Sequence, residues 1–199
     1  MADEPTLSTL EPIDALRLAH NAFASRLAMV AEPQMIDQSA CESWLVGDLI
    51  DHVIGGNLFT VAILNGATAD AAMVAARQGA EAGSERRRAA YAESAREMLR
   101  LIRADGVMHQ AYTHIDGPLS GREVVELRTE DVALHAWDLA RSIGGDETLD
   151  PDLVRHVWRH MSPRAEELTA SGQYGAGAVA GLPGDASLQT KLLIISGRS

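Results

Sequence analysis

Asp131 and His135 stand four residues apart in the stretch RTEDVALHAWDLAR, residues 128–141. In a helix this spacing stacks the two side chains on one face. A carboxylate and an imidazole placed in this way can bind one divalent metal from a single helix, with a third ligand supplied from elsewhere. Asp138 stays near that face, whereas Glu130 points about 100° away from Asp131. The pair predicts half of a metal site, and an exposed helix with a polar stripe is the alternative.

The helix that carries this pair has clear start and stop signals. Ser120 can cap its N-terminus, and Glu123, three residues later, completes the pattern of a capping box. Gly144 and Gly145 end the apolar pattern. The sequence therefore predicts that Asp131 and His135 lie in the middle of a stable helix.

Two earlier helices place histidines in the apolar seams that face a bundle core. Apolar positions recur at alternating spacings of three and four, as in packed helices. The seams consist of Ile13, Leu16, His20, Phe23, Leu27 and Val30, then Leu45, Leu49, His52, Gly56, Phe59 and Ile63. A buried histidine needs a polar partner, and for each one a structural role is the alternative. Two or more that meet beside a carboxylate indicate a metal in the bundle core.

The other histidines are weaker candidates for metal ligands. His109 and His114 fall in or near a predicted loop that contains the turn signal Asp-Gly-Pro. His156 and His160 share one helix face, but no acidic pattern is near them in the sequence. We therefore expect all four to lie outside the site.

The remaining segments complete an all-α pattern. Residues 69–104 favour helix with a break near the middle, 107–121 are loop-like, and 151–169 favour a further helix. The tail, 170–199, is rich in glycine, and its GAGAVAG lacks the spacing of a phosphate-binding loop. No alternating strand pattern is present. The sequence thus predicts a single domain, 1–199, with a four-helix-bundle core, additional short helices or turns and an irregular C-terminal tail.

Composition narrows the classes of partner and compartment. With 199 residues, 46% of them hydrophobic, and a net charge of −11, the chain is expected to bind neither nucleic acid nor an anionic membrane. The N-terminus shows no apolar signal-peptide core, and no run of 18 apolar residues suggests a membrane span. A single cysteine, Cys41, fits a reducing compartment and is interpreted as a partly buried thiol, with a nucleophile as the alternative. We expect a cytoplasmic protein.

Several motifs together resemble one known family. They are WLVGDLIDHVIGGN at 44–57, DGPLSGRE at 116–123, the stretch 128–141, and Ser-Gly-Arg at 196–198. The chain resembles the DinB/YfiT-like superfamily, and within it the branch with the N-terminal domain of mycothiol-dependent maleylpyruvate isomerase. The resemblance extends from the first helix to the C-terminus.

The resemblance implies a metal site and assigns its residues. His52 of the second helix and the acid-xxx-His pair Asp131 and His135 become the ligands, with zinc as the first choice of metal and nickel as the alternative. Asp131 stands where the isomerase has glutamate, so the metal position or the denticity of this ligand is expected to differ. His20, on a facing seam, is the candidate catalytic acid or base, with a hydrogen-bond donor to a metal ligand and a structural role in the core as the alternatives, and Asn57 is assigned to cofactor binding.

The resemblance also implies a class of reaction. Mycothiol or a similar low-molecular-weight thiol becomes the cofactor, and the thiol would attack a small electrophile or isomerise a double bond. Asp48 and Asp138 are expected to orient the metal-binding imidazoles. A metal-binding stress-response protein without catalysis and a bundle without a metal are the alternatives. A homodimer is kept as an open alternative to the monomer, and lack of room for the isomerase's second domain argues against maleylpyruvate itself as substrate.

Overall fold

The computed structural model describes residues 10–83, 86–171, 182 and 184–198, and these are mostly helical. The α-helices are α1 (Pro12–Met29), α2 (Val46–Leu64), α3 (Ala69–Gly83), α4 (Arg87–Leu101), α5 (Gly121–Ser142), α6 (Pro151–Met161), α7 (Ala165–Ser171) and α8 (Leu188–Ile195). Two short 3-10 helices, η1 (Glu32–Ile36) and η3 (Ser162–Arg164), and one hairpin of β1 (Ala111–His114) and β2 (Gly117–Ser120) join them. The predicted all-α fold class is confirmed.

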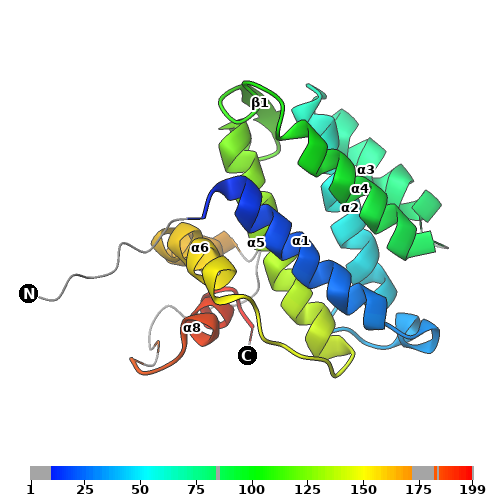
Figure 1. Ribbon diagram of the computed structural model, residues 1–199, viewed down its shortest axis with the longest axis vertical. Coiled ribbons are helices and arrows are strands. Elements are labelled where there is room, and N and C mark those ends of the chain that lie inside the picture. The colour runs from blue at the N-terminus through cyan, green and yellow to red at the C-terminus, as the bar shows by residue number, and fades with distance from the viewer. Residues whose placement is uncertain (1–9, 84–85, 172–181, 183, 199) are drawn as a thin grey trace, which may run out of the picture.

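Helix α5 lies in the middle of the helical packing. It packs against α1, α2 and α6, so nearly every face of its middle turns is covered. In Figure 1, α1 crosses α5, while α2, α3 and α4 lie together on one side and α6 and α8 on the other. Candidate ligands on α2 and α5 are therefore carried by helices in direct contact.

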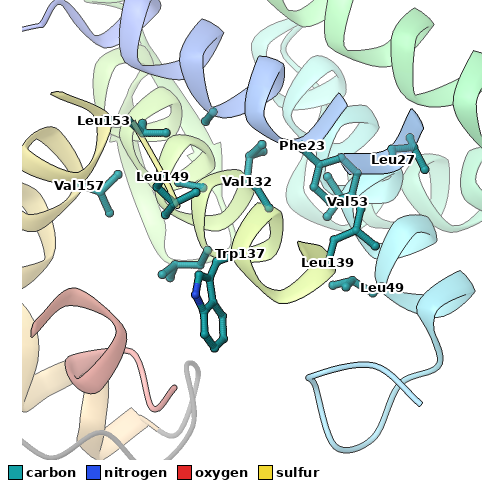
Figure 2. Close-up of a cluster of buried hydrophobic side chains, with 14 of the residues drawn as sticks. Phe23, Leu27, Leu49, Val53, Val132, Trp137, Leu139, Leu149, Leu153 and Val157 are labelled. Carbon is teal, nitrogen blue, oxygen red and sulfur yellow. The ribbon is translucent and has the colours of Figure 1, made fainter. Parts of the chain in front are cut away.

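The hydrophobic core holds α1, α2 and α5 in a fixed relative position. Figure 2 shows Phe23 and Leu27 of α1, Leu49 and Val53 of α2, and Leu139 of α5 in one cluster. Their exposed fractions are 0–1%. Each such side chain contributes about 1.5–3 kcal/mol of burial free energy, so the arrangement of the three helices is strongly determined.

The predicted cap of α5 is confirmed at the atomic level. The backbone N–H of Ser120 donates to Glu123 Oε2 at 2.7 Å, and the backbone N–H of Glu123 donates to Ser120 Oγ at 3.3 Å. These two bonds satisfy amide groups that the first turn of a helix leaves without partners. They fix the residue at which α5 begins.

Two segments differ from the sequence prediction. The predicted loop 107–121 contains the hairpin, with Ala111 opposite Ser120 and His114 opposite Gly117. Its strands of four residues are too short to display an alternating pattern, and Gly117, with a φ of +104°, follows the turn. The predicted helix 151–169 is divided by η3, where Pro163 removes a backbone donor. The predicted loop at 175–181 lies outside the described residues, as does the arm 1–9.

Helix α2 is long and apolar enough to cross a membrane by length and composition alone, with a mean hydropathy of 1.3. Half of this segment is buried inside the protein, where it packs against α3, α4 and α5. A core helix passes the same test. Packing within the domain therefore accounts for its apolar character.

Candidate metal centre

His52, Asp131 and His135 converge where α2 crosses α5. Asp131 Oδ1 lies 3.4 Å from His52 Nε2 and 3.3 Å from His135 Nε2, and one ligand atom from each residue falls within 4.8 Å of the others. Ligand atoms about 2.0–2.1 Å from a tetrahedral ion lie about 3.3–3.4 Å apart. The donor set and its spacing fit a divalent metal such as zinc.

The second nitrogen of His135 is held by a carboxylate. Asp138 Oδ2 accepts from His135 Nδ1 at 2.8 Å, and Arg198 donates to Asp138 through Nε at 2.8 Å and Nη2 at 2.7 Å. This places the proton on Nδ1 and leaves Nε2 free to bind a metal. Burial would raise the pKa of Asp138, but hydrogen bonds from His135 and Arg198 lower it to about 2. The predicted orienting role of Asp138 agrees with this geometry.

Charge at the centre favours an ionised Asp131. Burial would raise its pKa, but the charge of Arg128, followed by that of His135, holds the pKa well below its usual value. Burial would lower the pKa of His135, whereas the charge and hydrogen bond of Asp131 and the hydrogen bond of Asp138 raise it well above its usual value. A metal that binds His135 Nε2 must therefore displace a proton.

The centre opens to solvent on the side of His52. The His52 side chain is 39% exposed and that of Asp131 is 23% exposed, whereas that of His135 is 9% exposed. The predicted core position of His52 is therefore wrong, because the buried face of α2 passes through its neighbour Val53. The Trp44 ring lies 4.6 Å from the His52 ring and forms an apolar wall beside it. An open side of this kind is typical of catalytic metal sites.

Three other predicted residues take different positions. His20 is not part of the group of three; its Nδ1 lies 2.7 Å from the hydroxyl of Tyr91, so its catalytic role stays a prediction. Asn57 is fully buried under the site and accepts from Arg128, so its link to a cofactor also stays a prediction. Asp48 accepts from the backbone N–H of Leu45 at 2.9 Å and caps α2, which replaces the orienting role expected for it.

Cys41 comes closer to the site than the sequence indicated. Its Sγ lies 3.5 Å from Asp138 Oδ2, and Cys41, His135 and Asp138 form a second group of potential metal ligands. Both oxygens of Asp138 already accept from Arg198. The group that contains His52 is therefore the better candidate for a metal.

Another polar cluster occupies a different face of α5. His156 Nε2 lies 2.5 Å from Glu126 Oε2, and His160 Nδ1 lies 2.9 Å from Glu130 Oε1. These acids come from α5 across the helix interface, so no acidic pattern near the two histidines in the sequence indicated them. Glu126, His156 and His160 line a pocket of about 220 Å³, together with Leu10, Glu11, Arg122 and Arg159. None of the three candidate ligands lines it.

The family assignment follows from a direct match. The description "Mycothiol maleylpyruvate isomerase N-terminal domain" matches residues 16–140, which is more than half of the chain and includes all three candidate ligands. The chain belongs to this family. This assignment agrees with the resemblance inferred from the motifs around His52 and His135.

Relatives and solved structures support the same assignment. Two uncharacterized proteins of Mycobacterium tuberculosis, Rv0738 and MT0763, are each 32% identical over 149 residues, which is 73% of this chain and 74% of theirs. The crystal structure of the mycothiol-dependent maleylpyruvate isomerase superimposes with a TM-score of 0.62 at 17% identity, over 83% of this chain and 72% of that chain. A mutant of that isomerase superimposes with a TM-score of 0.63 at the same identity and coverage. These likenesses establish that the family member shares the isomerase fold.

Sequence patterns assigned no role to three residues that contact the candidate ligands or Asp138. Arg128 donates to Asp131 Oδ2 at 2.5 Å, Trp44 contacts His52, and Arg198 holds Asp138. The three-residue spacing of Arg128 and Asp131 could have indicated their ion pair. No local signal connects Arg198 to Asp138, which is 60 residues away.

Proposed function

We propose that this family member is a divalent-metal-dependent enzyme that uses a low-molecular-weight thiol of the mycothiol type. The observation that carries the proposal is the convergence of His52, Asp131 and His135 into a three-ligand set that is open on one side. Three protein ligands with one free position are typical of catalytic rather than structural metal sites. The family name supports mycothiol as the thiol.

Asp138 and Arg128 have different roles at this centre. A divalent metal, when bound, would supply a Lewis acid that favours the thiolate form of a thiol at neutral pH. Asp138 fixes the tautomer and ring orientation of His135. Arg128 neutralises one oxygen of Asp131, so the ligand set as a whole leaves a net positive centre. Such a centre attracts an anionic sulfur more strongly than water.

The open side favours a small electrophile as the second substrate. Trp44 places its ring beside the exposed edge of His52, where it can cover the apolar part of an incoming molecule. A thiolate held at the centre would add to this electrophile. It would then be eliminated again, which isomerises a double bond, or stay attached as a thioether while the electrophile takes up a proton or loses its leaving group. We propose that all of this chemistry takes place within one domain, in the cytoplasm, with zinc as the metal and nickel as the alternative.

Metal analysis followed by thiol titration tests the proposal. The purified protein should contain or take up one equivalent of zinc or nickel, measured by elemental mass spectrometry. The cobalt-loaded protein should develop a sulfur-to-metal charge-transfer band when mycothiol is added, because only a sulfur ligand gives this band. A protein that binds metal stoichiometrically but whose cobalt spectrum ignores the thiol across neutral pH would be a metal-binding protein without thiol chemistry.

A matched pair of variants connects any such band to this site. His52→Ala removes a ligand from the open side and should abolish both metal uptake and the band. His109→Ala replaces an exposed histidine outside the candidate site and should change neither the metal uptake nor the band. A band that persists in His52→Ala would place the thiol elsewhere.

A further inference from the structure

Arg128 is a buried cation in contact with one candidate ligand. Its side chain is 5% exposed, and each of its three nitrogens donates to a partner. Nε donates to Asn57 Oδ1 at 3.0 Å, Nη2 to the carbonyl of Val53 at 2.7 Å, and Nη1 to Asp131 Oδ2 at 2.5 Å. Helix α2 therefore supplies two anchors for the guanidinium, and the metal ligand itself is the third partner.

Gly56 provides the space for this guanidinium. A Cβ at position 56 would lie 2.0 Å from Arg128 Nη1, much closer than two such atoms can approach. The neighbouring Gly55 has no such restriction, because a Cβ there would meet only Ala76 and Ala80 at 3.7–3.8 Å, an ordinary contact distance. The glycine at 56 is thus required by Arg128, whereas the one at 55 is not.

The two carboxylate oxygens of Asp131 have different partners. Oδ2 accepts from Arg128, and Oδ1 is the oxygen that lies 3.4 Å from His52 Nε2 and 3.3 Å from His135 Nε2. The geometry points to Arg128 as a positioning residue that makes Asp131 a one-oxygen ligand of the metal. This inference rests on the proposed metal site and deepens it.

One-oxygen coordination matters because it keeps a coordination position free. A carboxylate that bound through both oxygens would add a ligand atom and occupy the position that the thiol needs. Arg128 holds Oδ2 of Asp131 through one charge-assisted hydrogen bond, and Asn57 and Val53 hold the guanidinium itself in place, so rotation of the Asp131 carboxylate is opposed. Asn57 then acts on the centre through Arg128, since its amide oxygen anchors Nε while its nitrogen donates to Ser94 at 3.1 Å.

The adjacent glycines of α2 provide the test. Gly56→Ala should displace the guanidinium from Asp131 while leaving every ligand in place, and Gly55→Ala is the matched control with the same change one residue earlier. Arg128→Met removes the guanidinium altogether. We expect about 10- to 100-fold weaker zinc binding in Gly56→Ala and Arg128→Met, measured by competition with a chromophoric chelator, and unchanged binding in Gly55→Ala.

The cobalt spectrum separates positioning from a general structural effect. Coordination by both oxygens of Asp131 would raise the coordination number and lower the intensity of the visible cobalt bands in Gly56→Ala and Arg128→Met. Circular dichroism and thermal melting establish that each variant is folded. Folded variants with the parent's zinc affinity and cobalt spectrum would overturn the assignment of Arg128. Failure of the parent protein to bind metal at all would instead refute the proposed function.

Discussion

Replacement of His20 by leucine should make the protein more resistant to acid. His20 is 3% exposed, and burial, followed by the charge of Arg128, lowers its pKa from 6.5 to about 3. The folded state therefore keeps His20 neutral while the unfolded chain takes up a proton below pH 6.5. Because the unfolded state binds more protons in this range, stability falls as the pH falls from 6.5 towards 3.

The size of this effect follows from the two pKa values. In the unfolded chain the pKa of His20 is 6.5, so pH 4 lies 2.5 units below it. Each unit corresponds to about 1.4 kcal/mol, so protonation of His20 in the unfolded chain lowers the free energy of unfolding by about 3 kcal/mol at pH 4. Leucine at position 20 cannot be protonated, so the variant does not lose this stability. At pH 7 the substitution loses one buried hydrogen bond to Tyr91, worth about 1 kcal/mol. The hydroxyl of Tyr91 keeps its bond to the backbone carbonyl of residue 20 at 3.1 Å.

Urea denaturation at a series of pH values measures this difference. His20→Leu should be equal to the parent or about 1 kcal/mol less stable at pH 7 and about 2–3 kcal/mol more stable at pH 4, so the two stability curves cross. His109→Leu, at an exposed position, is the control and should follow the parent curve. A difference between His20→Leu and the parent that does not change from pH 7 to pH 4 would refute the argument. Metal uptake by His20→Leu tests at the same time whether this histidine has a role at the centre.

Three further predictions concern α5 and its partners. Asp131→Ala or His135→Ala should abolish stoichiometric metal binding measured by elemental analysis. Glu130→Ala should retain it, since the Glu130 side chain points to α6. The reverse result would mean that the ligand register is wrong by one residue. Asp138→Asn should weaken zinc binding about 10- to 100-fold in a chelator competition, because His135 loses its orienting carboxylate; equal affinity would exclude that role. The hydrogen bond that His160 donates to Glu130 raises the pKa of His160, so this pair stabilises the fold below about pH 6.5 and the contribution is lost as the pH rises through the raised pKa. His160→Leu should therefore cost less than about 1 kcal/mol at pH 5.5 and still less at pH 8.5 in urea denaturation, and a larger cost at the higher pH would contradict the sign.

Local signals in the sequence determined the helices and the phase of the ligand pair. The proline at the start of α1, the capping box at Ser120 and the glycines after α5 act within a few residues of the chain, where backbone geometry and short-range hydrogen bonds decide the structure. The spacing of Asp131 and His135 fixes their shared face for the same reason. These features were predictable because each depends on neighbours that the sequence shows directly.

Tertiary structure decided which side chains meet across helices. Helical periodicity shows that a residue faces a neighbour, but not which residue of that neighbour it faces. His52 meets Asp131 across 79 positions, and Arg128 reaches Asn57 across 71. The exposure of His52, the separate partner of His20 and the acids beside His156 depend on how the core sets the rotation of each helix. That rotation results from the packing of many side chains at once, so no single spacing in the sequence encodes it.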